Sequence, residues 1–344
     1  MTKSNDISTN VDEAERSNNE HEPALVISPA IKNAYQSLLG KNVATRSTAA
    51  IRAMVAFSMI RLPYPRQLEA MLTFHEAQQL AKSMKGHRQN AICLFAQAHT
   101  GKSTVAEHFT EIANESAPEG CKPVTYIAFG SGGGPLQMYR AILKANGEGF
   151  PATKDLEILR ERAGEVMKNA GTEIVVIDET HEGAKGSIYG PSLTSELKTL
   201  LNDGIVGIVL LGTEKAEELI AKDKEFLMRT MAPCRLDALN WADDEDRELW
   251  IGFLAALDDE MVRLRLVSEP TGFAEEELAS ALCNACDGVI GQLMKVVLHA
   301  LRIAIHDDRT FIVLEDIAAA VDDWSLKLNL VDCNPIDFLL QDAA

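Results

Sequence analysis

One short motif constrains the fold of this chain more than any other feature. The stretch "FAQAHTGKST" (residues 95–104) follows the apolar run "AICLFA" (91–96) and opens a helical pattern. It contains the Gly-Lys-Ser half of the phosphate-binding pattern Gly-x-x-x-x-Gly-Lys-Ser/Thr, but Ala96 stands where the pattern has its first glycine. A buried strand that leads through such a loop into a helix predicts a nucleotide-binding α/β domain. Alanine is the smallest departure from the missing glycine, so we expect the loop to tolerate it.

The loop residues would have complementary tasks at a bound nucleotide. Backbone N–H groups of residues 98–103 would point at the β-phosphate, helped by the helix N-terminus. Gly101 permits a close backbone approach, Lys102 would neutralise phosphate oxygens, and Ser103 would ligate Mg²⁺. ATP and Mg²⁺ are therefore the expected cofactors. The candidate binding residues are Ala98, His99, Thr100, Gly101, Lys102, Ser103 and Thr104.

Two adjacent carboxylates follow the apolar run "EIVVID" (173–178). A buried strand would deliver Asp178 to its carboxyl end, where it would share Mg²⁺ with Ser103. The next residue, Glu179, would orient and polarise the attacking water. A strand can also end in acids merely because it meets solvent, but an acid pair at this distance after the loop fits an ATPase better.

Later polar residues are candidates for sensing the γ-phosphate. Thr213 ends the run "IVGIVLLGT" (205–213) and could either sense this phosphate or cap the following helix "EKAEEL". In "KEFLMRTMAPCR", Arg229 and Arg235 precede a last strand-like segment. One of them could reach the γ-phosphate of a neighbouring subunit, although either could equally be a surface salt-bridge partner.

The order of the expected elements gives the domain organisation. Apolar runs alternate with helical stretches up to residue 240, which indicates a parallel sheet covered on both faces. Beyond Trp241 only helical patterns follow. The expected strands are 91–96, 123–129, 173–178 and 205–213. The expected parts are a disordered acidic tail (1–26), an N-terminal helical segment (27–88), an α/β ATPase core (89–240), a helical domain (241–328) and a C-terminal tail (329–344).

The net charge and the cysteines limit which partners and which cellular compartment can be expected. The net charge of −18 argues at first sight against nucleic-acid binding, but most of the acid lies in residues 1–24 and 237–344. Residues 25–236 are nearly neutral, so they could still present a basic stripe to the phosphates of a nucleic acid. We find no signal peptide and no apolar run long enough to cross a bilayer. The six cysteines are then expected to be reduced, which predicts a cytoplasmic protein without a membrane partner.

These features occur in the order typical of an AAA+ ATPase, and more specifically the chain resembles the TniB/TnsC family of AAA+ transposition regulators. "VIDETH" resembles that family's Asp-Glu-x-His, and "VLLGTEKA" its Val-Gly-Thr-x-x-Ala sensor strand. "MYRAILKANGEGFP" resembles its Tyr-x-x-Leu-Leu-x-x-Leu-Gly-x-Pro segment, and "GVIGQLMKVVLHA" its Gly-x-Ile-Gly-x-Leu lid helix. The similarity spans residues 30–310 and implies a P-loop AAA+ parallel sheet flanked by helices, with a C-terminal all-α lid domain.

The resemblance also implies a function. Such proteins bind ATP and hydrolyse it, here slowly and in a regulatory role. They assemble as homo-oligomeric rings or helical filaments on double-stranded DNA. They recruit a DDE transposase to that target, together with a target-selection protein or complex.

Carried over by position, the resemblance assigns roles to single residues. Thr213 would be sensor 1 and Arg229 the trans-acting arginine finger, while Asp178 and Glu179 would form the Walker B pair. Many AAA+ proteins have a sensor-2 arginine in the lid helix. This chain offers Gln292 and Lys295 there; Lys295 would substitute for the arginine, or the cis site lacks that contact.

DNA contact would come from the loop and helix after the second strand. The glycines of "GSGGG" (130–134), with Ser131 among them, would let the backbone approach a phosphate chain closely. Arg140 and Lys144 lie one helical turn apart on the following helix. The alternative is a flexible connector followed by a solvated helix face. Non-specific phosphate binding predicts an affinity that falls steeply with salt.

Two other functions share part of this site. Another AAA+ switch, such as a replication loader, a secretion-linked ATPase or a signalling NTPase, would keep the nucleotide site but not the DNA filament. A small-molecule kinase with a P-loop would need an acceptor pocket and lid arginines, and it gives no reason for a separate helical domain.

Overall fold

The computed structural model describes the chain over four stretches, residues 41–130, 133–149, 153–183 and 192–342. The chain forms two compact units, residues 1–49 and 50–344. Of the first unit, only the start of helix α2 (Lys41–Ser58) lies within the described residues. The acidic tail lies outside them, so its disorder stays a prediction, as do the domain boundaries. All other helices and strands within the described residues belong to the second unit.

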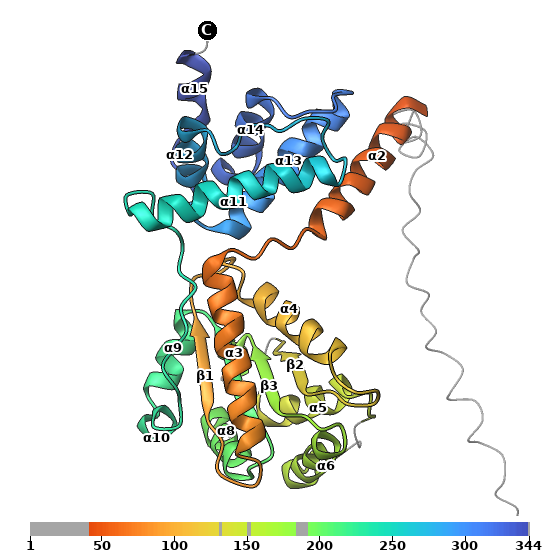
Figure 1. Cartoon of the computed structure of the whole chain (residues 1–344), viewed down its shortest axis with the longest axis vertical. Helices are drawn as coiled ribbons and strands as arrows, with labels where there is room; N and C mark the ends of the chain where they lie inside the picture. Colours follow the sequence, from red (N-terminus) through yellow and green to blue (C-terminus); the bar gives the residue numbers. More distant parts are fainter. Residues whose placement is uncertain (1–40, 131–132, 150–152, 184–191, 343–344) are drawn as a thin grey trace, which may run out of the picture. The chain divides into compact units, whose positions relative to one another are not determined.

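Four parallel strands form one sheet in the order β1-β4-β3-β2 (Figure 1). Aliphatic side chains dominate β1, β3 and β4, and every residue of these strands is buried, as expected when helices cover both faces of a parallel sheet. The register pairs Phe95 with Gly212, so the carboxyl ends of β1 and β4 meet at the same edge. The four predicted strands are confirmed, each slightly shorter than expected. Their bounds are β1 (Ala91–Phe95), β2 (Val124–Ala128), β3 (Ile174–Asp178) and β4 (Gly207–Gly212).

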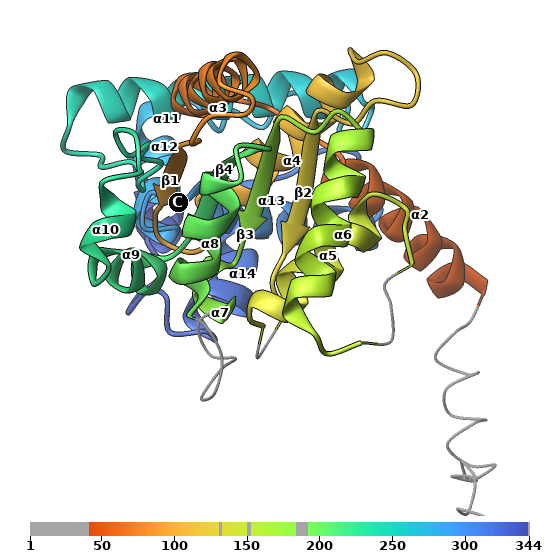
Figure 2. The same cartoon turned by 90° about the horizontal axis from the view of Figure 1, so that it is seen from below.

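Strand residues alternate between two hydrophobic cores, one on each face of the sheet. In β1, Ile92 and Leu94 face one core, whereas Cys93 and Phe95 face the other. Figure 2 shows the helices of the two faces on opposite sides of the sheet. The first face is covered by α3 (Pro65–Ser83) and α4 (Lys102–Glu115). The second face is covered by α5 (Pro135–Ala145), α6 (Leu156–Asn169), α8 (Leu193–Asn202) and α9 (Glu214–Ala221), with the short helices α7 (Thr180–Gly183) and α10 (Lys224–Leu227) in the connections.

Local signals in the sequence account for several helix starts. The Asp155 carboxylate accepts the backbone N–H of Glu157 over 2.9 Å and so caps α6. The Ser192 hydroxyl accepts a backbone N–H in the same way at the start of α8. Helices α3 and α5 begin with a proline, whose missing N–H would be unpaired in the first turn anyway.

Beyond Trp241 the described chain is helical and contains no strand, as the fold class predicts. The indole of Trp250 is fully buried at the centre of these helices, and its Nε1 donates to the carbonyl of Ala279 over 3.0 Å. The segment expected to be a tail contains a short helix that buries Ile336. The helices are α11 (Asp244–Arg263), α12 (Glu276–Ala285), α13 (Ile290–His306), α14 (Leu314–Ala320), the π-helical η2 (Val321–Leu326) and α15 (Ile336–Asp342).

The segment after α10 runs beside β1. Two isolated parallel bridges pair Thr230 and Cys234 with β1. The sequence placed a strand-like segment after both arginines, and this is wrong: the pairing segment lies between Arg229 and Arg235. It contains Pro233, which has no N–H to donate, and this explains why the bridges do not extend into a regular strand.

A glycine is required where the lid meets the chain that leads into it. The backbone N–H of Leu239 donates to the carbonyl of Gly288 over 3.0 Å. Gly288 has a φ of +64°, and a Cβ at this position would lie 1.8 Å from the carbonyl oxygen of Leu239. Both the backbone conformation and the close approach therefore exclude any side chain.

We expect Gly288→Ala to lower the free energy of unfolding by at least about 2 kcal/mol, because strain and a backbone clash add together. Urea unfolding followed by circular dichroism measures this change. Gly252→Ala is the matched control, since Gly252 lies within α11 and a Cβ there meets open space. The control should be unchanged or more stable by up to about 1 kcal/mol. Equal midpoints for Gly288→Ala and the native protein would contradict the close contact.

Candidate nucleotide-binding site

The loop between β1 and α4 has the backbone of an anion-binding turn. His99 and Gly101 have φ angles of +66° and +96°, and such alternation turns successive N–H groups toward one point. The hydroxyl of Thr100 donates to the carbonyl of Gln97 over 3.1 Å and closes the turn. Ala96 has no positive φ, so the position of the missing first glycine suits alanine.

Lys102 is buried and folded back over this loop. Its Nζ donates to the carbonyl of Ala96 over 2.8 Å and to that of Gln97. Burial lowers the pKa of this amine, while the charges of Asp178 and Glu179 act in the opposite direction. A desolvated ammonium held by carbonyls at the start of a helix is suited to binding phosphate oxygens.

Asp178 lies at the end of β3, almost completely buried. Its Oδ2 accepts the hydroxyl proton of Tyr126 over 2.7 Å, and its Oδ1 accepts the backbone N–H of Glu179 over 2.7 Å. The Ser103 side chain lies near the Tyr126 hydroxyl. Burial, followed by the Asp178 charge, raises the pKa of Tyr126. Asp178 is thus held by a tyrosine that no sequence motif indicates, and Ser103 lies near the same tyrosine.

Glu179 directly after Asp178 combines a strained backbone with an accessible carboxylate. Its φ is +54°, a left-handed conformation that costs a non-glycine residue about 1 kcal/mol and is concentrated at functional sites. Its side chain is 48% exposed. His181 lies beside it, with Nδ1 3.4 Å from Glu179 Oε2 and Nε2 3.4 Å from Glu182 Oε1. The carboxylate therefore reaches solvent while a histidine limits its orientation.

The chemistry of this site fits a magnesium ion that arrives with phosphate groups. A hydroxyl and a carboxylate oxygen are ligands that Mg²⁺ prefers. The described residues contain no group of three or more His, Cys, Asp or Glu side chains that would hold a metal by themselves. Ser103 and Asp178 would therefore bind Mg²⁺ only together with phosphate oxygens and water, as is usual for this ion.

Thr213 lies between the phosphate loop and the carboxylates. It follows β4, the strand between β1 and β3, and the Ala96 N–H donates to the carbonyl of Gly212 over 3.2 Å. Thr213 precedes α9 at the capping position, but its hydroxyl makes no capping hydrogen bond. The hydroxyl oxygen is buried without a partner. This geometry favours a sensor over a cap, because a buried hydroxyl of this kind needs a ligand or water.

A cavity of about 300 Å³, which the sequence did not indicate, opens beside the loop. Five segments line it: residues between 57 and 63, α3 with Gln67 and Met71, the start of α4 with Gly101 and Thr104, α11 with Phe253, and α13 with Met294 and Lys295. Most of its surface is apolar. Its volume is at the low end for small-molecule sites and suits one ring system next to bound phosphates. The only sequence signal is the pair of prolines in "RLPYP", which favours an extended connector at this point.

The lid helix contacts the loop through a glycine. The Gly291 N–H donates to the carbonyl of His99 over 3.0 Å, and a Cβ on Gly291 would lie 2.3 Å from that oxygen. Position 291 of the lid helix, which touches the loop directly, therefore has no space for an arginine. Lys295 is exposed and lines the cavity, whereas Gln292 is buried with its Oε1 unpaired.

The two arginines near the end of the sheet differ in environment. Arg229 lies at the start of β1, where its carbonyl accepts the Ala91 N–H, and this is the end of the strand opposite the phosphate loop. One of its guanidinium nitrogens, Nη1, is buried without a hydrogen bond. Arg235 is 61% exposed, with its Nη2 3.6 Å from Glu217 Oε1. The position of Arg229 excludes a role at the loop of its own chain and leaves a role at a neighbour's loop open.

Of the three candidate DNA-contact residues, the structure describes only one with an exposed side chain. Ser131 lies outside the described residues. The Arg140 guanidinium donates to the carbonyl of Thr153 over 2.8 Å, so this side chain is already engaged within the chain. Lys144, in the last turn of α5, is exposed.

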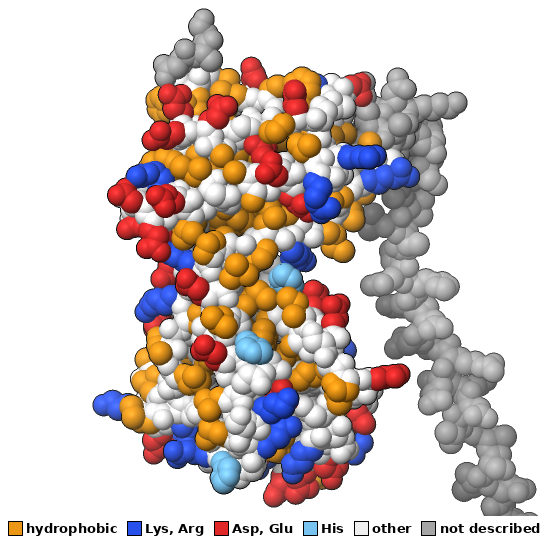
Figure 3. Space-filling model, viewed as in Figure 1, with side chains coloured by type: hydrophobic (Ala, Val, Ile, Leu, Met, Phe, Trp, Pro, Cys, Tyr) orange, Lys and Arg blue, Asp and Glu red, His pale blue; other side chains and the backbone are white. Residues whose placement is uncertain are grey.

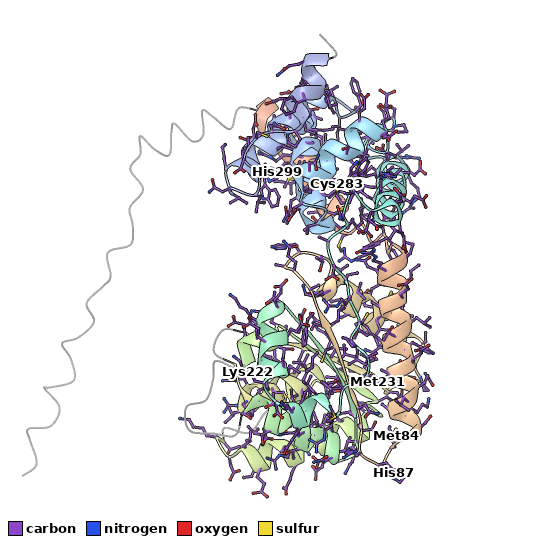
Figure 4. All side chains as sticks on the ribbon, turned by 90° about the vertical axis from the view of Figure 1, so that its left-hand side faces the viewer. Met84, His87, Lys222, Met231, Cys283 and His299 are labelled. Carbon is purple, nitrogen blue, oxygen red and sulfur yellow. The ribbon has the colours of Figure 1, made fainter. Side chains whose placement is uncertain are left out.

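Exposed basic residues that the sequence analysis did not single out lie in the turn between α3 and β1. The turn carries Lys85, His87 and Arg88, all exposed, and Figure 4 labels His87 there. Lys82, just before the turn, lies 3.3 Å from a carboxylate oxygen of Glu173. In Figure 3, acidic side chains gather instead over the lid helices, in agreement with the acidic C-terminal third. The turn therefore offers a basic surface on the α/β part of the chain.

The fold and the site together define the AAA+ class of ATPases. Solved structures that share the fold include the following two. ORC2 from Aeropyrum pernix, solved as ADPNP–ADP complexes, has a TM-score of 0.58 at 15% identity, covering 79% of this chain and 72% of that chain. Cdc6p from Pyrobaculum aerophilum has a TM-score of 0.57 at 13% identity, covering 77% and 69%. At these identities the likeness shows the fold alone.

The family is given by a match in sequence. The profile of the family described as "Bacterial TniB protein" matches residues 61–238, just over half of the chain. The chain belongs to the TniB family, as the resemblance predicted. A sequence comparison with curated proteins gives no significant match.

Among the described helices, no single one is long and apolar enough to cross a bilayer. Helices α12 and α13 reach this length and apolarity only as a pair, and the pair is bent by 108°.

Proposed function

We propose that this chain is an ATP-dependent regulator of DNA transposition that assembles on double-stranded DNA and recruits a DDE transposase. Membership of the TniB family supports this proposal, because the TniB/TnsC resemblance implies such an assembly. The observation that carries it is the convergence at one sheet edge of a phosphate loop, a buried carboxylate and an unpaired buried hydroxyl. These are the parts that P-loop ATPases use to bind and sense a triphosphate.

The residues divide the binding task among themselves. The apolar cavity beside Gly101 would hold the adenine base, and the loop N–H groups with Lys102 would bind the phosphates. Ser103 and Asp178 would hold Mg²⁺, which when bound neutralises phosphate charge. The exposed carboxylate of Glu179 would accept a proton from the attacking water.

Assembly would control hydrolysis in this arrangement. Thr213 would hydrogen-bond the γ-phosphate or the attacking water, and this would satisfy its buried hydroxyl. Gly291 leaves no space for a lid arginine at the loop, so positive charge at the γ-phosphate would come from a neighbouring copy. A single copy would then bind ATP and turn it over slowly.

We expect Arg229→Ala to reduce the ATPase rate of the DNA-bound assembly at least about 100-fold, since arginine fingers contribute this much or more. Binding of ATP to the single chain should not change, because Arg229 lies at the far end of β1 from its own loop. Arg235→Ala is the matched control and should stay within a factor of about three of the native rate, as expected for an exposed surface pair. A large loss of ATPase rate in Arg235→Ala, with little loss in Arg229→Ala, would assign the arginine finger to Arg235 instead.

The proposal as a whole is tested by assembly on DNA. The chain is mixed with duplex DNA and with ATP, ADP or no nucleotide, and is examined by sedimentation and negative-stain electron microscopy. We expect rings or filaments only with ATP and DNA together, and an affinity that falls steeply with salt. A chain that stays monomeric with ATP and DNA at low salt would overturn the proposal. If it still binds ATP, another kind of AAA+ switch would be favoured.

A further inference from the structure

A tyrosine of β2 holds one of the residues that would bind the metal. Tyr126 donates its hydroxyl proton to Asp178 Oδ2 over 2.7 Å, and the Ser103 side chain lies near this hydroxyl. The sheet register pairs Tyr126 with Val176, two residues before Asp178, so this contact follows from the strand pairing. Tyr126 belongs neither to the phosphate loop nor to the acid pair after β3.

Two hydrogen bonds hold the carboxylate of Asp178. Its Oδ2 accepts the hydroxyl proton of Tyr126, and its Oδ1 accepts the backbone N–H of Glu179 over 2.7 Å. A carboxylate oxygen has two lone pairs, so each oxygen keeps one lone pair available for a metal ion. The two hydrogen bonds thus orient a buried carboxylate that is an expected ligand of Mg²⁺.

We propose that Tyr126 is a positioning residue for Mg²⁺, acting through Asp178 rather than by touching the nucleotide. This inference rests on the proposed nucleotide site. Outer hydrogen-bond partners of metal ligands commonly change metal affinity 10- to 100-fold. Removal of the phenol oxygen would leave one oxygen of the buried Asp178 carboxylate with one hydrogen bond fewer and would free this carboxylate to rotate.

The test compares Tyr126→Phe with the native full-length chain. Binding of a fluorescent ATP analogue is titrated with excess EDTA and at increasing concentrations of Mg²⁺. We expect affinity in EDTA to agree within about twofold, because the phosphate loop is unaltered. The Mg²⁺ concentration for half-maximal binding should rise about 10-fold. Asp178→Asn should show a rise at least as large, and adding Tyr126→Phe to it should produce little further change.

Tyr139→Phe is the matched control. Tyr139 also donates to a buried carboxylate, Glu196 Oε2, over 3.1 Å, but it lies in the other core, away from the loop. It should leave the Mg²⁺ dependence of binding unchanged. Melting curves check the fold, and Tyr126→Leu, which also lacks the hydroxyl, replaces the phenylalanine variant if that variant does not fold.

The outcomes separate the inference from the site on which it rests. An unchanged Mg²⁺ dependence in Tyr126→Phe, with normal nucleotide binding, would overturn the positioning role alone. An equal rise in Tyr139→Phe would overturn it too, because the effect would then be a general loss of stability. If the native chain bound no nucleotide, the proposed function would fail and the role of Tyr126 with it.

Discussion

Lys102→Ala is expected to abolish nucleotide-dependent assembly on DNA. The native amine is buried and bonded to two loop carbonyls, and it would provide the charge closest to the phosphates. Charge-assisted hydrogen bonds of this kind are worth about 1.5–3 kcal/mol each, so nucleotide affinity should fall at least about 100-fold. The measurement is binding of a fluorescent ATP analogue, followed by sedimentation with ATP and duplex DNA.

The control has to separate lost binding from lost folding. Removing the amine leaves the carbonyls of Ala96 and Gln97 without a donor, so a small loss of stability is expected. Melting temperatures therefore accompany the binding curves. Lys222→Ala, at an exposed lysine just after α9, should assemble like the native chain. Normal assembly by Lys102→Ala would contradict the assignment of the loop.

Glu179→Gln is expected to separate binding from hydrolysis. The amide keeps the size of the side chain but cannot accept a proton from water, and loss of a general base commonly costs 10²- to 10⁴-fold in rate. Hydrolysis should fall at least about 100-fold, whereas ATP binding and assembly persist. The ATP-bound assembly should therefore outlast the native one. Phosphate release and the lifetime of assemblies after dilution measure the two effects.

Glu182→Gln is the matched control for this variant. Glu182 contacts the same histidine as Glu179, through the other ring nitrogen and at the same distance of 3.4 Å. Its substitution should change the hydrolysis rate by less than a factor of about three, because Glu182 is not the carboxylate that directly follows β3 and is not expected to act as the general base. Equal losses in both variants would indicate that His181, rather than the Glu179 carboxylate, governs the rate.

The fold was largely predictable because its signals are local. Each strand is a short apolar run. Parallel strands have their carboxyl ends at the same edge of a sheet, and the pairing of Phe95 with Gly212 follows from this rule alone. The loop from Ala98 to Ser103 follows from its position between a strand and a helix. The segment beside β1 was misplaced, since Pro233 interrupts the pairing and isolated bridges leave no apolar run to recognise.

The rest of the site could not be predicted, because it depends on contacts between distant segments. The cavity joins the connector before α3, the start of α4 and the lid helix. Tyr126 reaches Asp178 from another strand, 52 residues earlier in the sequence. Gly291 is recognisable as part of a motif, but only its 3.0 Å contact with His99 explains the glycine. The sequence allows Thr213 to be either a cap or a sensor, and only the folded structure shows that its hydroxyl makes no capping hydrogen bond.

The claim on which everything else depends is that each chain binds one ATP between the phosphate loop and the cavity. Counting radiolabelled, slowly hydrolysed ATP analogue per chain tests this directly, both on the free protein and on purified DNA-bound assemblies. The expected result is one nucleotide per chain in the assembly, lost in Lys102→Ala. Stable binding of the protein to DNA with no nucleotide bound, at saturating analogue and Mg²⁺, would contradict the account.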